Sequence, residues 1–261
     1  STFSGADSLF AGAINDGTFR SLSLYKDGVG VLGLSGASNY TGVTKVYQGA
    51  LSVSHGSALG ATSGSTVVFA GAALRIAGGI TSGEPLFLAG AGVAGTGVLR
   101  NLSGANTLSG AIALSAPSRF VSDAGTLTLG GAVSGVGHAL TLGGAGNGSI
   151  SGPIATTTGT VTKDGAGTWT LSGANTYTGT TTVAAGLLNL NGTSTGAGDF
   201  TVAEDFEEFL VVTHKAGVGQ HRDVDFGDLG IEPGEIADVD DDRFHAESRL
   251  VKTAVREFTV K

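Results

Sequence analysis

The fold of this chain is decided by one short motif, Ser172-Gly-Ala-Asn-Thr-Tyr-Thr-Gly179, which the sequence repeats. Its other versions are Ser35-Gly-Ala-Ser-Asn-Tyr-Thr-Gly42 and Ser103-Gly-Ala-Asn-Thr-Leu-Ser-Gly110. The three begin at positions 35, 103 and 172, with intervals of 68 and 69. A nearly constant interval of this kind indicates a solenoid, in which each unit stacks on its neighbour. We therefore expect an elongated protein whose function depends on its surface.

The residues between the motifs alternate in the manner of β-strands. Every second residue shares a face in Thr168-Trp-Thr-Leu-Ser172, Thr180-Thr-Thr-Val183 and Leu188-Asn-Leu-Asn191. Glycine clusters between these segments supply the corners. Divided into three coils, the interval predicts about 23 residues per rung of a parallel β-helix. Residues 1–200 would then form roughly eight or nine rungs.

The alternation also predicts which side chains form the core and which form the corners. The inward residues of the two best-matching units should be Leu32, Leu34, Val46, Leu51 and Val53, equivalent to Trp169, Leu171, Val183, Leu188 and Leu190. The glycines of the three motifs should lie at matching corners, with the Asn and Ser side chains bonded to the backbone there. The structural repeat residues are Gly36, Tyr40, Gly42, Gly104, Asn106, Gly110, Gly173, Asn175, Tyr177 and Gly179.

Residues 161–190 closely resemble the autotransporter-associated β-strand repeat, which is found in passenger regions of bacterial surface proteins. Lys163-Asp-Gly-Ala-Gly167 opens this segment and aligns without a gap to Lys26-Asp-Gly-Val-Gly30, so residues 26–53 are a second match. Residues 99–114 are a degenerate third. The resemblance covers most of residues 1–200. It implies a right-handed parallel β-helix on an exported, surface-exposed scaffold, and it implies no enzymatic activity.

The composition changes sharply near Gly198–Val202. Residues 1–200 carry 7 acidic and 7 basic side chains, whereas residues 201–261 carry 15 acidic and 7 basic ones. Glycine falls from 41 to 5 across the same boundary. We therefore predict two domains, a β-solenoid over 1–200 and a small acidic α+β domain over 201–261.

The second domain should contain a strand over Glu208–Thr213 and a helix that starts near Asp240. A domain of this size buries only a small core, so we expect it to cover the solenoid end or to bind another subunit. The expected assembly residues are Phe206, Phe209, Phe226, Leu250, Val255 and Phe258.

No catalytic or cofactor-binding residues are predicted. Gly28-Val-Gly-Val-Leu-Gly33 satisfies a dinucleotide-binding pattern, but it lies inside a β repeat and is interpreted as a turn. Asp238, Asp240 and Asp242 are weak candidates for a Ca²⁺ site, and Arg243 stands where a calcium-binding loop needs glycine. We interpret these aspartates as a solvated acidic run. The histidine spacings match no zinc template.

Three functions remain open. The first is a bacterial surface or extracellular scaffold that adheres to a glycan or another cell-surface ligand, or that forms a filament. The second is a virion appendage or decoration protein, a β-helical spike that self-associates or docks through residues 201–261. The third is a polysaccharide-active β-helix enzyme, which needs basic residues or paired carboxylates gathered on one face, and the acids of the solenoid are too scattered to nominate a pair.

The composition limits the classes of partner that we expect this chain to bind. An acidic chain without a basic stripe argues against nucleic acid. No apolar run of about 18 residues is present, so we expect no membrane-spanning helix. Ser1 is consistent either with signal-peptide cleavage or with removal of an initiator methionine.

Overall fold

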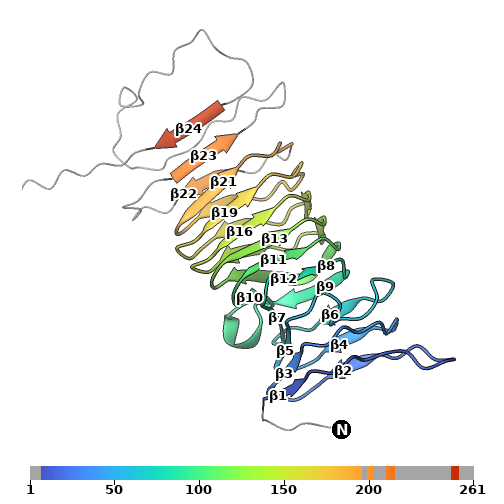
Figure 1. Cartoon of the computed structure of the whole chain (residues 1–261). Coiled ribbons are helices and arrows are strands. Elements are labelled where there is room, and N and C mark those ends of the chain that lie inside the picture. The colour runs from blue at the N-terminus through green and yellow to red at the C-terminus, as the bar shows by residue number, and fades with distance from the viewer. Residues whose placement is uncertain (1–6, 196–198, 203–209, 215–247, 253–261) are drawn as a thin grey trace, which may run out of the picture.

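The fold is seen in a computed structural model that describes residues 7–195, 199–202, 210–214 and 248–252. Residues 7–195 and 199–202 form a parallel β-solenoid of about nine turns, with about 21 residues in each turn (Figure 1). Successive turns stack along one axis, from the blue N-terminal strands to the orange strands of the last turn (Figure 1). The expectation of a mainly β, parallel solenoid is confirmed.

Three stacks of parallel strands run along the solenoid, and we call them sheets I, II and III. Sheet I contains β1 (Ser8–Phe10), β3 (Val31–Leu34), β5 (Ala50–Val53), β7 (Ala73–Ile76), β10 (Leu99–Asn101), the second half of β12 (Ile112–Ser122), β15 (Leu140–Gly143), β18 (Val161–Lys163), β20 (Thr181–Val183) and β22 (Phe200–Val202). Sheet II contains β2 (Leu24–Lys26), β4 (Thr44–Val46), β6 (Thr66–Val68), β9 (Leu86–Gly90), the first half of β12, β14 (Val133–Ser134) and β17 (Ile154–Ala155). Sheet III contains β8 (Thr81–Ser82), β11 (Ala105–Leu108), β13 (Thr126–Leu129), β16 (Asn147–Ile150), β19 (Thr168–Leu171) and β21 (Leu187–Leu190).

The turns differ in length. Leu32 pairs with Leu51 and Leu74 pairs with Leu99, so the second of these turns is longer than the first. The expected rung of about 23 residues is therefore wrong, because the turns vary in length and average about 21 residues. Most strands have only two to five residues, so the corners take up the remaining length, and corners tolerate insertions. A short 3₁₀ segment, η1 (Val93–Gly95), lies in one of the long corners.

The core is a continuous stack of aliphatic side chains, and the predicted register is confirmed. Eight of the ten predicted inward residues are buried. The other two, Leu32 and Leu190, are partly buried and pack against the same core. Trp169 is fully buried, and its ring fits because the residue beside it is Gly148, where a Cβ would lie 2.5 Å from the ring. A one-residue slip would turn this whole set outward.

The two best-matching repeats lie on different faces of the solenoid. The first occupies sheets II and I through β2, β3, β4 and β5. The second occupies sheets I and III through β18, β19, β20 and β21. Each copy therefore has two strands per turn. Relative to the first copy, the second is rotated about the solenoid axis by one sheet. The rotation arises because sheet III begins only at β8, after the first copy.

The C-terminal part contains an antiparallel pair, β23 (Leu210–His214) and β24 (Ser248–Lys252). β23 lies against β21 of the last turn (Figure 1). The strand expected near Glu208–Thr213 is confirmed over most of its length. The helix expected through Leu250 is wrong there, because residues 248–252 form a strand whose β-branched partners in β23 favour a ladder. No α-helix occurs among the described residues.

Several predicted residues fall outside the part of the chain that the structure describes. They are Phe206, Phe209, Phe226, Val255 and Phe258 of the assembly set, and the calcium candidates Asp238, Asp240 and Asp242. Leu250 lies in β24, but its side chain is not described. The assembly role, the calcium site and the boundary at residue 200 therefore stay predictions.

Candidate functional site

A buried lysine closes one corner of each repeat, and we call this arrangement the lysine clamp. Lys163 Nζ donates to the carbonyl oxygens of Asp164, Gly165 and Ala185 at 3.1, 2.7 and 2.9 Å. An ammonium has three donors, and all three are used here. The third bond joins this turn to the next one along the solenoid. Burial lowers the pKa of Lys163 to about 8.

The first repeat has the same clamp. Lys26 Nζ donates to the carbonyl oxygens of Asp27, Gly28 and Gln48 at 3.2, 2.6 and 3.0 Å. Burial likewise lowers the pKa of Lys26. The backbone also matches, because Gly28 and Gly165 have φ angles of 80° and 82°. Residues 28–30 form the turn between β2 and β3, and residues 31–33 lie in β3, so the Gly28–Gly33 segment leads into no helix and is part of the β repeat, as expected. In the sequence, the clamp corresponds to the Lys-Asp-Gly segment that the two repeats share. No role was predicted for its lysine.

A buried tyrosine follows each clamp. Tyr40 hydrogen-bonds Thr44 Oγ1 at 2.6 Å, and Tyr177 hydrogen-bonds Thr181 Oγ1 at 2.8 Å. Both rings are almost completely buried. A tyrosine hydroxyl that is buried needs such a partner, so the pair lets a large ring enter the core. The two repeats therefore share a tyrosine–threonine pair as well as a clamp.

The polar residue at the fourth position of each motif binds the backbone of the preceding turn. Asn175 Oδ1 accepts from the Ile154 amide at 3.0 Å, and Asn106 Oδ1 accepts from the Ile80 amide at 2.7 Å. In the first motif the acceptor is Ser38 Oγ, which receives the amide of Ile14 at 3.1 Å. The expected side-chain bonds to the backbone at the bends are therefore present in all three motifs.

The expected alignment of the motif corners holds only in part. Gly36 and Gly104 both follow a strand of sheet I. Gly42 and Gly110 both precede a strand of sheet II. The third motif departs, because Gly173 stacks on Gly152 in the column that contains Gly110, while Gly179 stacks on Gly159 before sheet I. The expectation of one common edge is wrong for this motif, for the same reason that its repeat is rotated.

Two ion pairs cross the outside of sheet I. Arg100 pairs with Asp123, and Arg119 pairs with Asp164, two turns away. Gly143 lies between Arg119 and Asp164, and a Cβ there would overlap both side chains. Asp164 therefore has a second role besides its place in the corner of the repeat.

Exposed aromatic side chains gather on the first turns of sheet II. Tyr25, Tyr47, Phe69 and Phe87, which we call the aromatic strip, come from β2, β9 and the residues that follow β4 and β6, and they are between 38% and 59% exposed. The Tyr47 and Phe69 rings stack with centroids 4.8 Å apart. Lys45 Nζ lies 5.9 Å from the centre of the Tyr25 ring. A concentration of exposed rings on one face is typical of an interaction surface.

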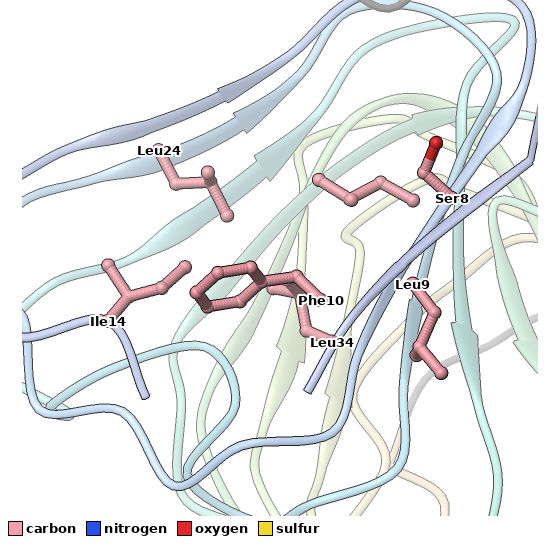
Figure 2. Close-up of a pocket in the computed structure, with 7 residues that line it drawn as sticks. Ser8, Leu9, Phe10, Ile14, Leu24 and Leu34 are labelled. Atoms are coloured by element: carbon pink, nitrogen blue, oxygen red, sulfur yellow. The ribbon is translucent and has the colours of Figure 1, made fainter. Parts of the chain in front are cut away.

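The open end of the core forms a hollow of about 530 Å³ at the first turn. Phe10, Ile14, Leu24 and Leu34 point toward one another there from β1, the loop after it, β2 and β3 (Figure 2). Ser8, Leu9 and Leu32 complete the lining, which among the described residues contains no ionisable side chain. The hollow is continuous with the apolar stack of the first turn.

The described residues contain no group of three or more His, Cys, Asp or Glu side chains placed to hold a metal ion. In the same part of the chain, every helix is too short to cross a bilayer. The conspicuous polar groups are those that join one turn to the next. The described residues thus form a parallel β-solenoid that contains two clamped two-strand repeats.

Residues 24–53 and 161–190 match the family called passenger-associated-transport-repeat. The chain thus carries two copies of this repeat, and they are the two segments that contain the lysine clamps. Neither the curated proteins nor the solved structures gave a match to the chain.

Proposed function

We propose that this chain is a structural part of a bacterial surface or secreted protein, a rod that displays its faces outside the cell. The observation that carries the proposal is the pair of passenger-type repeats with identical corners. Repeats of this kind are architectural, and their polar groups here are used to join turns. The proposal assigns no catalytic residue, and the exported rod supplies length and surface.

The location of the protein in its source cells tests this proposal. Intact cells are treated with a protease that does not cross membranes, and the rod is then detected with an antibody against the solenoid. We expect the signal to be lost from intact cells or to be found in the medium, while a cytoplasmic marker stays intact. A rod that is degraded only after the cells are lysed would contradict the proposal.

A second role is adhesion to a carbohydrate through the aromatic strip. Exposed tyrosine rings combine an apolar face with a hydroxyl, and this combination suits a sugar ring. Tyr25 and Tyr47 lie on adjacent turns, with ring centroids 6.4 Å apart, so an extended chain could contact both. The remaining exposed positions of the described turns are mostly small residues, Ala, Thr, Ser and Gly.

A glycan array tests this role with two variants. Tyr25→Ser with Tyr47→Ser should abolish binding, because it removes two rings of the strip. Thr141→Ser, on the outside of sheet I, is the matched control and should leave binding unchanged. Absence of any glycan binding by the wild type, or equal binding by the tyrosine variant, would refute an adhesive role for this surface.

A further inference from the structure

A column of glycines occupies the corner before sheet II, and one acidic residue interrupts it. At each of these glycines a Cβ would meet the backbone of the preceding turn, so larger residues are excluded. Leu86 pairs in register with Thr66, and Glu84 and Gly64 lie two residues before these partners. Glu84 therefore occupies the position that glycine has in the turns before and after it. The column runs Gly42, Gly64, Glu84, Gly110, Gly131, Gly152, Gly173, Gly192.

Glu84 is buried inside the solenoid, and no charged residue of the described part of the chain pairs with it. Its side chain is only 3% exposed. Oε1 accepts a hydrogen bond from Thr66 Oγ1 at 3.1 Å, whereas Oε2 is buried and has no hydrogen-bond partner among the described residues. Burial raises the pKa of Glu84 to about 7. A carboxylate in this position has lost its water and has gained only one hydroxyl in return.

The groups around Glu84 do not neutralise its charge. Thr66 pairs in register with Thr44, which hydrogen-bonds the Tyr40 hydroxyl. The Thr66–Glu84 and Thr44–Tyr40 hydrogen bonds therefore lie on adjacent turns. Tyr40 is the titratable group that faces Glu84, and burial together with the Glu84 charge raises the pKa of Tyr40 to about 12. No Lys, Arg or His within the described ranges forms an ion pair with Glu84.

Glu84 also lies where the architecture changes. It follows β8, the first strand of sheet III, and precedes β9 of sheet II. Turns before this point have only sheets I and II, whereas sheet III begins here and all three sheets are present until β17. We propose that Glu84 is a pH-sensitive contact at this junction, which holds the adjoining turns together when its carboxyl is protonated and loosens them when it ionises.

The direction of the effect follows from proton uptake. The ordinary pKa of a glutamate, 4.5, applies to the unfolded chain, and the folded value is about 7. Between these values the folded junction holds a proton that the opened junction has lost, so opening becomes more favourable as the pH rises. One proton changes the opening equilibrium by about tenfold per pH unit. From pH 5 to pH 7 the total change is about 40-fold, because the proton difference is less than one near either pKa value.

Hydrogen exchange measured by mass spectrometry tests the proposal on the full chain. Protection factors, corrected for the intrinsic exchange rate at each pH, are compared between residues 36–90 and residues 161–190. We expect protection of residues 36–90 to fall on going from pH 5 to pH 7, while residues 161–190 change little. Glu84→Gln should remove this fall, whereas Asp27→Asn, at an exposed corner, should keep it. A wild-type fall that is equal in both segments, or that persists in Glu84→Gln, would overturn the proposal.

A second measurement needs no variant and therefore does not depend on how Glu84→Gln folds. The chain is labelled with ¹³C at the glutamate carboxyl, and its infrared spectrum is recorded from pH 5 to pH 8. We expect a protonated carboxyl band that persists at pH 6, where an ordinary glutamate is ionised, and that disappears by pH 8. Its absence at pH 6 would show that Glu84 is ionised in the folded protein and would refute the proposal.

Discussion

Replacing Lys163 by methionine tests whether the clamp stabilises the repeat. The substitution keeps an unbranched side chain of similar length and removes the ammonium. Lys163 is fully buried, so no water replaces the lost donors. The carbonyl oxygens of Asp164, Gly165 and Ala185 would all lose their contact with Nζ. The perturbation is therefore confined to the corner and its link to the next turn.

The expected magnitude follows from two opposing terms. A buried acceptor left without a donor costs about 1–3 kcal/mol, and three acceptors are affected. Removing a buried ammonium returns several kcal/mol of desolvation, which offsets part of this loss. We therefore expect Lys163→Met to lower the free energy of unfolding by about 2–4 kcal/mol. Lys26→Met should have a similar effect on the first repeat, because its three bonds are the same.

Denaturant unfolding followed by tryptophan fluorescence measures this loss. Trp169 is the single tryptophan, and it is buried in β19, close to the second clamp in sequence. Lys45→Met, on the outer face of β4, is the matched control and should cost less than about 1 kcal/mol. If Lys163→Met unfolds at the same denaturant concentration as the wild type, the three hydrogen bonds contribute no net stability and the reasoning fails.

Four further outcomes follow from the described contacts. Leu171→Asp should cost more than about 4 kcal/mol, because it buries an unpaired charge, and thermal unfolding at the wild-type midpoint would refute the register. Tyr177→Phe should cost about 0.5–1.5 kcal/mol through the lost bond to Thr181, as a denaturation curve will show. Gly143→Ala should separate Arg119 from Asp164 and make stability less dependent on salt, and an unchanged salt dependence would contradict this. Wild-type stability should rise between pH 8 and about pH 10.5, because the unfolded chain still holds a proton that buried Lys163 has lost, and Lys163→Met should show a smaller rise, since Lys26 with its lowered pKa remains.

Much of the fold could be predicted from alternation alone. Period two placed Leu171, Val183 and Leu188 in the core, and all three are buried. The bends were predicted to bind polar side chains, and Asn106 and Asn175 do so. These features are local, so a single sequence contains the information that determines them.

The arrangement of the repeats could not be predicted in the same way. Turn length depends on the corners, and a corner of any length can connect two strands that keep their register. The nearly constant spacing of the motifs therefore did not fix the face on which the third motif lies. The burial of Glu84 was missed for a related reason, because its position in the glycine column is visible only when the turns are stacked.

The candidate site was predicted least well. The Lys-Asp-Gly segments of the two repeats align in the sequence, but no role was predicted for Lys26 and Lys163, which make the bonds that join the turns. Lysine is usually exposed, and three backbone carbonyls are needed to hold it inside. A sequence shows the lysine but not the carbonyl oxygens that converge on it from the next turn.

Engineered disulfides test the central claim, the parallel stacking of turns of about 21 residues, most directly. The chain contains no cysteine, so a new pair reports only its own distance. Thr162 and Thr182 are directly paired in β18 and β20. Parallel neighbours lie about 4.8 Å apart, within the range that a disulfide spans. Thr162→Cys with Thr182→Cys should therefore oxidise readily. Thr162→Cys with Ala185→Cys should not, although a rung of about 23 residues would bring this second pair together. Formation of the second disulfide in place of the first would contradict the account.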